Sequence, residues 1–233
     1  KTLILDHLKD NAIILVNSDD EANTAFKKDG HKRLSYGYNG DYKILDFNTT
    51  PANTNLTFEF ENKKYEVTTP LTSKFNVYNY LTMLSIVNNL GVDVDKIVEE
   101  TKNMKAPKGR CEAYEVNNGY AIIDYAHTPD AVEKVITAYN ELKNNKVLTI
   151  IGCGGDRDPK KRPIMGNIAT ELSDYVIFTN DNPRTEDPEM IMKDILAGVT
   201  KDNYEVILDR REAIKTGIDK LEKDDILLIL RKG

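Results

Sequence analysis

The sequence predicts an α/β fold in which a mostly parallel sheet carries helices on both faces. After Gly109, short apolar runs alternate with segments of helical periodicity, the pattern of parallel strands joined by crossover helices. The runs cover residues 121–123, 147–151, 175–178, 204–208 and 226–230. Thr128 before Pro129 and Asp187 before Pro188 each mark a helix start, because a capping residue precedes proline at the first helical position.

The segment before Gly109 is predicted to be richer in strands. Apolar runs bounded by turn residues indicate short strands, of which the last two would form a hairpin, at residues 12–16, 34–38, 42–47, 57–60 and 65–68. Apolar residues at helical spacing predict helices at 77–90, where Gly91 follows, and at 94–104. Proline and glycine then break the pattern at 106–109, so we predict two domains, residues 1–107 and 108–233.

Composition and charge exclude several classes of protein. The net charge of −6 is spread without a basic run, so no nucleic-acid partner is expected. No apolar run approaches the roughly 20 residues of a membrane helix, and no signal peptide is present, so we predict a cytoplasmic protein without a membrane partner. Cys111 and Cys153 lie far apart without CxxC spacing, which fits a reducing compartment better than a disulfide framework or a zinc site.

The N-terminus indicates a fragment. The chain begins at Lys1 without a methionine, and its first stretch is typical of the middle of a helix. The phosphate-binding P-loop GxxxxGK[ST] occurs nowhere in the sequence, so an ATP site would need its phosphate cradle from a missing front portion.

Polar clusters follow three of the predicted strands directly, at residues 124–130, 152–158 and 179–186. The carboxyl ends of parallel strands line one edge of an open α/β sheet, where ligands bind, so we expect these loops to meet at one crevice. Each loop alone could consist of ordinary turn residues. Arg157 and Arg184 argue against that, because two guanidinium groups on one edge suit a carboxylate or phosphate.

The glycine-rich run Gly152-Cys153-Gly154-Gly155 does not fit a dinucleotide fingerprint, because Arg157 stands where the third glycine of GxGxxG belongs. We expect instead a flexible loop whose backbone approaches a ligand, with residues 156–158 as its working side chains.

Together these clusters resemble the Mur ligases of peptidoglycan synthesis. The resemblance is carried by DYAHTPD at 124–130, GCGGDRD at 152–158 and DNPRTE at 181–186, supported by FNVYN at 75–79 and GRCE at 109–112. It implies that residues 1–107 are the second half of a central ATPase domain lacking its P-loop. Residues 108–233 would be a Rossmann-like C-terminal ligase domain with a mostly parallel sheet.

The resemblance implies roles for several residues in ATP binding and catalysis. Asn76 and Asn79 would contact adenine, since carboxamides offer both a donor and an acceptor. Solvated capping residues are the alternative for this pair. Arg110 would reach the ATP phosphates, Asp124 would accept from the ribose hydroxyls, and His127 would lie near the phosphates. His127 could equally be structural, and we do not assign it as a general base.

For the amino-acid substrate, the resemblance points to the family members that add meso-diaminopimelate, which carry arginine at the position of Arg184. The distal carboxylate of diaminopimelate suits a guanidinium, whereas the ammonium group of lysine would be repelled. Arg157, Asp181 and Asn182 would complete the pocket. The family's closing Gly-Lys-Gly-His-Glu segment is replaced by Arg231-Lys232-Gly233, which puts tight amino-acid binding in doubt.

The implied reaction uses ATP and Mg²⁺ to join diaminopimelate to UDP-N-acetylmuramoyl-L-alanyl-D-glutamate through an acyl phosphate. Lys1, as a carbamate, would help to hold the magnesium ion. The resemblance also implies a monomer, and without the P-loop this chain alone is expected to be inactive. The alternatives are a lysine-adding or folylpolyglutamate-type ligase, or a non-catalytic nucleotide- or amino-acid-binding module. A nicotinamide dehydrogenase is disfavoured by the failed glycine spacing.

Overall fold

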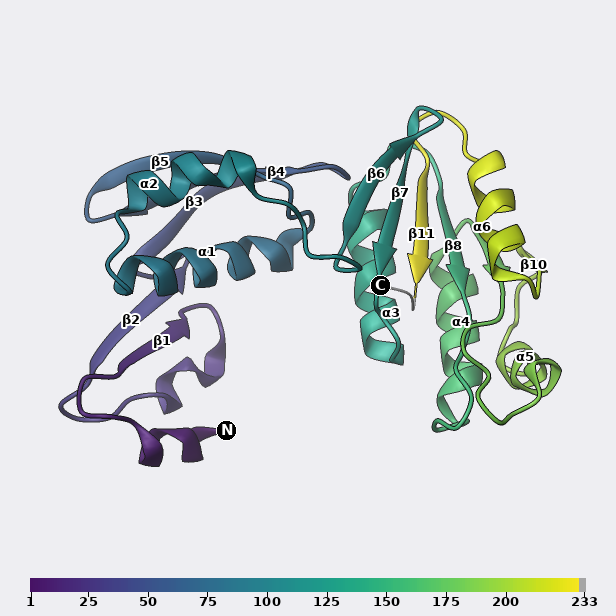
Figure 1. The fold of residues 1–233 in the computed structure, drawn as a ribbon, viewed down its shortest axis with the longest axis horizontal. Helices are drawn as coiled ribbons and strands as arrows, with labels where there is room; N and C mark the ends of the chain where they lie inside the picture. Colours follow the sequence, from purple (N-terminus) through teal and green to yellow (C-terminus); the bar gives the residue numbers. More distant parts are fainter. Residues whose placement is uncertain (231–233) are drawn as a thin grey trace. The chain divides into compact units, whose positions relative to one another are not determined.

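The computed structural model describes residues 1–230, so the altered segment Arg231-Lys232-Gly233 lies outside the described residues. The chain divides into two compact units, Lys1–Lys105 and Ala106–Gly233 (Figure 1). The boundary that the sequence predicts, after residue 107, lies two residues beyond this division.

The first unit contains a mixed five-stranded sheet in the order β1-β2-β3-β4-β5. The first three strands pair in parallel and the last three pair antiparallel. The strands are β1 (Ile13–Asn17), β2 (Lys32–Gly37), β3 (Tyr42–Thr49), β4 (Thr54–Phe60) and β5 (Lys63–Thr69). The unit also contains two α-helices, α1 (Lys74–Asn89) and α2 (Val94–Glu100). Its 3₁₀ turns are η1 (Thr2–His7), η2 (Glu21–Ala25) and η3 (Thr101–Asn103).

Local chemistry explains the hairpin and the placement of α1. Glu61 and Asn62 both have positive φ, 50° and 61°, as a tight two-residue turn between β4 and β5 requires. Helix α1 buries Leu81 and Leu84, and the hydroxyl of Tyr42 donates to Asn88 Oδ1 at 2.7 Å. A buried sheet residue is therefore tied to the last turn of the helix that packs on it.

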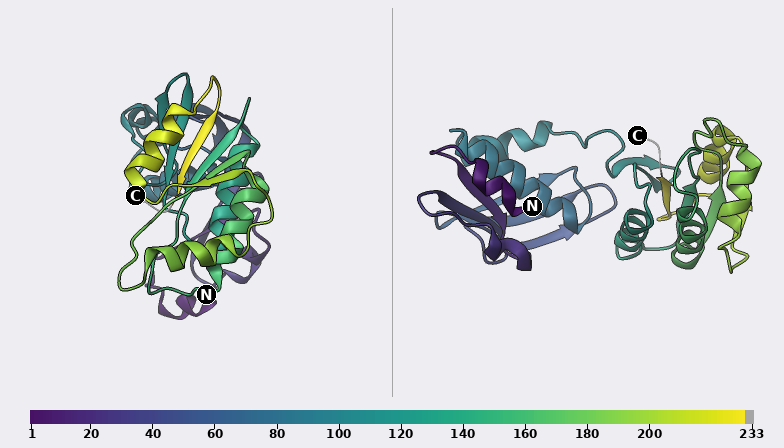
Figure 2. Two further views of the ribbon diagram at one scale, coloured as in Figure 1. Left: turned by 90° about the vertical axis from the view of Figure 1, so that its right-hand side faces the viewer. Right: turned by 90° about the horizontal axis from the view of Figure 1, so that it is seen from below.

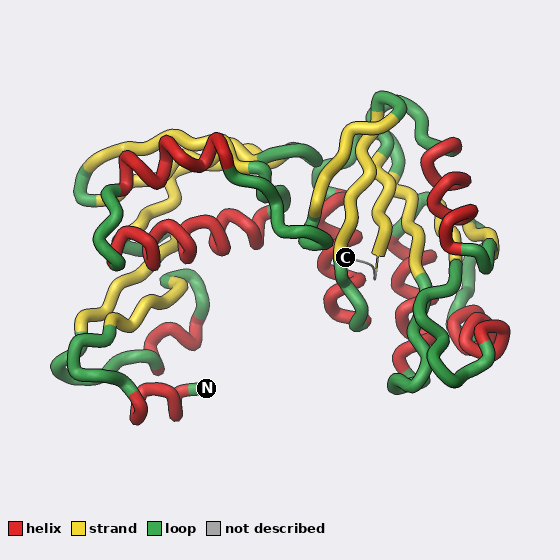
Figure 3. The backbone as a smooth tube through the Cα atoms, viewed as in Figure 1, coloured by secondary structure: helices red, strands yellow, loops and turns green. Residues whose placement is uncertain are grey.

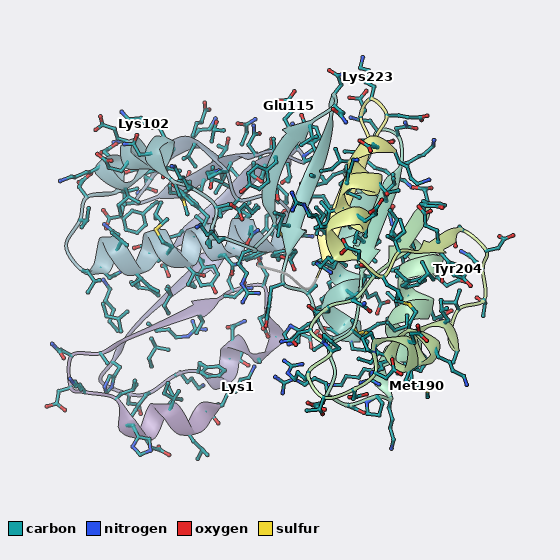
Figure 4. The ribbon with its side chains drawn as sticks, turned by 45° about the vertical axis from the view of Figure 1, so that its right-hand side comes forward. Lys1, Lys102, Glu115, Met190, Tyr204 and Lys223 are labelled. Atoms are coloured by element: carbon teal, nitrogen blue, oxygen red, sulfur yellow. The ribbon has the colours of Figure 1, made fainter. Side chains whose placement is uncertain are left out.

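The second unit contains a six-stranded sheet in the order β10-β9-β8-β11-β7-β6. Its strands are β6 (Glu112–Val116), β7 (Gly119–Asp124), β8 (Val147–Ile151), β9 (Tyr175–Phe178), β10 (Tyr204–Val206) and β11 (Ile226–Leu230). Strand β6 runs antiparallel to β7, and the other pairings are parallel. In Figure 4, Glu115 and Tyr204 mark the two edge strands β6 and β10. The mostly parallel sheet is confirmed, whereas β6 was not predicted.

Helices cover both faces of this sheet, as predicted (Figure 2). One buried cluster joins the strands to α3 (Pro129–Asn140), α4 (Lys161–Leu172) and α5 (Pro188–Leu196), and a second joins the opposite face to α6 (Arg210–Asp219). The predicted caps are present, because Thr128 accepts from Ala131 N–H and Asp187 from Glu189 N–H. None of the helices in the described part of the chain has the length and apolar character of a membrane span.

Candidate functional site

Loops from the carboxyl ends of β7, β8 and β9 line one pocket of about 340 Å³ in the second unit. Figure 3 shows these connections as loop segments that leave the ends of the strands. The polar side chains around the pocket are mostly cationic or aromatic and include Tyr125, His127, Arg157, Asp158, Lys161 and Arg184. Both arginines that the sequence singles out therefore line the same pocket, which can receive an anionic group.

The β8–α4 and β9–α5 loops are joined by hydrogen bonds. Gly155 N–H donates to Asn182 O at 2.9 Å, and Thr185 Oγ1 donates to Asp156 Oδ1 at 2.7 Å. Asp156 N–H in turn donates to Glu186 Oε1 at 2.5 Å. The carboxylate of Asp156, expected to act on a ligand, is therefore engaged in holding the neighbouring loop.

The glycines of the β8–α4 loop allow this close packing. A Cβ atom on Gly152 would lie 2.2 Å from Thr179 O, and one on Gly155 would lie 1.9 Å from Pro183 O. Both distances are too short for any side chain, so only glycine lets the two backbones approach. Gly152 and Gly155 thus approach the next loop, while Cys153 and Gly154 between them line the pocket, so the approach of this backbone to a ligand stays a prediction.

Arg184 is held against the β8–α4 loop. Its Nη1 donates to Gly155 O at 2.6 Å, and its own N–H donates to Asn182 Oδ1 at 3.2 Å. Its φ of 52° lies in the left-handed region, where a residue with a side chain persists only if its surroundings hold it there. The hydrogen bond from the guanidinium to Gly155 O fixes the direction of this side chain.

The structure divides the predicted amino-acid pocket. Arg157 and Arg184 line the pocket described above, whereas Asp181 and Asn182 line a second hollow of about 760 Å³ with Leu208, Asp209 and Arg210. Asn182 also uses its carbonyl and its side-chain oxygen to hold Gly155 and Arg184. The four residues therefore belong to one loop pair but do not line a single cavity.

Asp124 is 8 % exposed and already accepts several hydrogen bonds within its own unit. Its Oδ1 accepts from Ala126 N–H at 2.8 Å, and its Oδ2 accepts from Cys111 N–H at 2.9 Å. Burial, and next the adjacent Asp124 carboxylate, raise the pKa of the Cys111 thiol to about 12. Cys111 and Cys153 are both buried, and both belong to the hydrophobic core.

Arg110 and His127, for which the family resemblance implies roles near the ATP phosphates, both lie beside Tyr125. The Arg110 guanidinium carbon is 5.3 Å from the centroid of the Tyr125 ring, and the rings of Tyr125 and His127 are 5.1 Å apart. His127 Nδ1 also lies 3.0 Å from Tyr125 O. The sequence analysis assigned no role to Tyr125, which the structure leaves 45 % exposed directly after β7.

Arg162, in the first turn of α4, was also missed by the sequence reasoning. It is 3 % exposed and forms ion pairs with Glu186 at 2.8 Å and Asp194 at 2.9 Å. Its hydrogen bond to Glu186 is the main cause that lowers the pKa of that carboxyl group. Because Arg162 follows two lysines, Lys160 and Lys161, the sequence does not indicate that its side chain is buried.

In the first unit, Asn76 and Asn79 lie together at the start of α1. Asn76 is buried, its Nδ2 donates to Thr72 O at 2.6 Å, and its Oδ1 accepts from Asn79 Nδ2 at 2.9 Å. Asn79 is exposed. Asn76 is therefore not the solvated capping residue given above as the alternative, because it is buried inside α1, whose N-cap is Ser73. The contact of Asn76 and Asn79 with adenine stays a prediction.

Tyr78 anchors the same helix start to the loop after β1. Its hydroxyl donates to Asp19 Oδ2 at 3.1 Å, and the same oxygen accepts from Tyr38 N–H at 2.9 Å. Burial, and next the hydrogen bond to Asp19, raise the pKa of Tyr78 to about 12.

Lys1 is exposed and directly precedes η1 (Figure 4). Within residues 1–230, no group of three or more His, Cys, Asp and Glu side chains could hold a metal ion.

The fold and the pocket define an α/β protein with a cationic binding site at the carboxyl edge of a mostly parallel sheet. Residues 1–87 match the Mur ligase middle domain, and residues 109–233 match the family described as "Mur ligase, glutamate ligase domain". The chain belongs to the Mur ligase family.

Two relatives are named UDP-N-acetylmuramoyl-L-alanyl-D-glutamate–2,6-diaminopimelate ligase. The protein from Rickettsia bellii is 44 % identical over 99 % of this chain and 50 % of its own length. The protein from Fusobacterium nucleatum is 42 % identical over 97 % of this chain and 47 % of its own length. The chain thus spans about half the length of the curated relatives it matches.

Solved structures agree on the fold. A structure of a UDP-N-acetylmuramoyl-L-alanyl-D-glutamate–2,6-diaminopimelate ligase superimposes with a TM-score of 0.69 at 32 % identity, covering 95 % of this chain and 48 % of that one. The MurF ligase from Thermotoga maritima, in complex with ADP, gives a TM-score of 0.71 at 20 % identity, covering 97 % of this chain and 51 % of that one. At that lower identity the likeness supports the fold alone.

Proposed function

We propose that this chain is the rear part of an ATP-dependent ligase that joins meso-diaminopimelate to UDP-N-acetylmuramoyl-L-alanyl-D-glutamate. The observation that carries the proposal is the pocket that Arg157 and Arg184 line together at the carboxyl edge of the sheet. The names of the Rickettsia and Fusobacterium relatives support the same reaction. The protein would act as a cytoplasmic monomer, and this chain alone would be inactive because its sequence holds no P-loop.

The pocket supports selection of the amino acid by charge. Diaminopimelate ends in a second amino-acid group, whose carboxylate can accept hydrogen bonds from the guanidinium groups of Arg157 and Arg184. Lysine ends in an ammonium group, which two arginines and Lys161 would repel. Asp181 and Asn182 would contact the amino acid from the second hollow, next to Arg184 in the same loop.

We assign the nucleotide to the residues that the family resemblance implies. ATP would transfer its terminal phosphoryl group to the substrate carboxylate, giving an acyl phosphate and ADP. The amine of diaminopimelate would then attack the acyl carbon, forming the amide as phosphate leaves and the amine loses a proton. Arg110 and His127, both exposed beside Tyr125, would lie near the phosphates. Asn76, Asn79 and Asp124 would contact the nucleoside. Carbamylated Lys1 and the magnesium ion remain a proposal that rests on the family resemblance alone.

The proposal can be tested with the full-length protein. The assay supplies ATP, UDP-N-acetylmuramoyl-L-alanyl-D-glutamate and equal concentrations of meso-diaminopimelate and lysine, and mass spectrometry identifies the product. We expect the diaminopimelate adduct with stoichiometric ADP. A lysine adduct as the main product, or ADP release that needs no amino acid, would reject the proposal.

A further inference from the structure

The Arg162–Glu186 pair links four elements of the second unit. Arg162 lies in α4, Glu186 in the β9–α5 loop and Asp194 in α5, and the guanidinium bonds both carboxylates. Glu186 Oε1 accepts from Arg162 Nη2 at 2.8 Å and also from Asp156 N–H in the β8–α4 loop. One carboxylate oxygen therefore connects a buried cation to the backbone beside Arg157.

Both loops contain a residue that its surroundings must hold in place. Asp156 has a φ of 51° and Arg184 a φ of 52°, each in the left-handed region that disfavours residues with side chains. Asp156 directly precedes Arg157, and Arg184 is itself a pocket residue. Strain of this kind persists only where neighbouring contacts fix it, and Glu186 contacts the strained Asp156 directly.

We propose that Arg162 is a positioning residue: its buried guanidinium acts through Glu186 to hold the β8–α4 and β9–α5 loops so that Arg157 and Arg184 line one pocket. This role rests on the proposed function, since it assigns those arginines to the incoming amino acid. Arg162 also borders the pocket, but its guanidinium is paired with two carboxylates, so we assign it to positioning rather than to binding the substrate carboxylate.

Asp194 provides a matched control for Glu186. Both carboxylates pair with the same guanidinium at similar distances, and their side chains are comparably accessible, 41 % for Asp194 and 32 % for Glu186. Asp194 lies on α5, and no hydrogen bond to either loop is recorded for it among the described residues. Asp194→Asn therefore weakens the ion pair without altering the loop contact.

The first test measures steady-state kinetics of the full-length ligase with Glu186→Ala, Glu186→Gln and Asp194→Asn. Because a hydrogen bond to a charged group is lost, Glu186→Ala should raise KM for meso-diaminopimelate roughly tenfold or more, with KM for ATP unchanged. Glu186→Gln should have a smaller effect, since its amide oxygen can still accept from Asp156. An equal rise for Asp194→Asn, or no rise for Glu186→Ala, would overturn the proposal.

A second test separates this inference from the proposed function. Amide hydrogen exchange in the folded chain should accelerate at Gly155 and Asp156 in Glu186→Ala and stay at the wild-type rate in Asp194→Asn. Uniform acceleration in both variants, with equal losses of Tm, would show a merely structural ion pair and overturn the proposal. A wild-type ligase that does not use diaminopimelate would instead reject the proposed function, while the exchange result would still decide whether Glu186 holds the loop.

Discussion

The guanidinium of Arg184 donates a 2.6 Å hydrogen bond to the carbonyl of Gly155, 29 residues away in the sequence. This bond fixes a side chain of the β9–α5 loop to the backbone of the β8–α4 loop, which carries Arg157. The pocket is therefore a product of two loops packed together, and perturbing either loop should disturb amino-acid binding.

Gly155→Ala should separate the two loops. The new Cβ would lie 1.9 Å from Pro183 O, and relief of that overlap should lower the free energy of unfolding by about 1–3 kcal/mol. Urea denaturation measures this loss. Gly30→Ala is the comparison for a surface glycine, because nothing lies within 4 Å of its Cβ position and only its φ of 78° is penalised. In the full-length ligase, Gly155→Ala alone should raise KM for diaminopimelate; unchanged stability and KM would contradict the packing role.

Glu186 should contribute to stability in a pH-dependent way. Its pKa is lowered from the ordinary 4.5 by Arg162 and then by the Asp156 N–H, so its contribution is present above pH 4.5 and is lost as pH falls through the lowered folded-state value. Denaturation of wild type and Glu186→Gln at successive pH values should show a steeper acid loss for wild type. If the unfolding free energies of wild type and Glu186→Gln fell equally with pH below 4.5, the pairing of Glu186 with Arg162 would be contradicted.

Tyr78→Phe should weaken the anchoring of α1. Loss of the hydroxyl bond to Asp19 should cost about 0.5–1.5 kcal/mol of unfolding free energy, measured by urea denaturation. Tyr114→Phe is the matched control, because its hydroxyl bonds Glu112 at an exposed position and should matter little. An equal effect of both substitutions would contradict the anchoring role.

Tyr78 should also affect stability at alkaline pH. Its folded-state pKa of about 12 exceeds the ordinary 10.0, so the unfolded chain ionises first and stability falls as pH rises from 10 towards 12. Tyr78→Phe should lack that part of the fall. If the unfolding free energies of the variant and wild type fell equally between pH 10 and 12, the raised pKa of Tyr78 would be contradicted.

Much of the second unit could be predicted from the sequence because its signals are local. The caps at Thr128 and Asp187 act within one helical turn, and parallel strands necessarily bring their following loops to one edge. The edge strand β6 escaped prediction because its burial pattern is mostly exposed or intermediate, so no apolar run marks it.

The details of the site depended on partners distant in the sequence. The sequence predicts Arg162 to be a surface cation, because its partners Glu186 and Asp194 are 24 and 32 residues away in the chain. Nor does the sequence show that the β9–α5 backbone packs against Gly152 and Gly155. Long-range packing of this kind leaves no periodic signal in a single sequence.

The most direct test of the central claim is the selectivity of the full-length ligase between meso-diaminopimelate and lysine, compared in wild type and Arg184→Ala. If the guanidinium binds the distal carboxylate, the ratio of kcat/KM for the two amino acids should fall at least about tenfold, with lysine use unchanged or improved. A ratio that stays at the wild-type value would contradict the account.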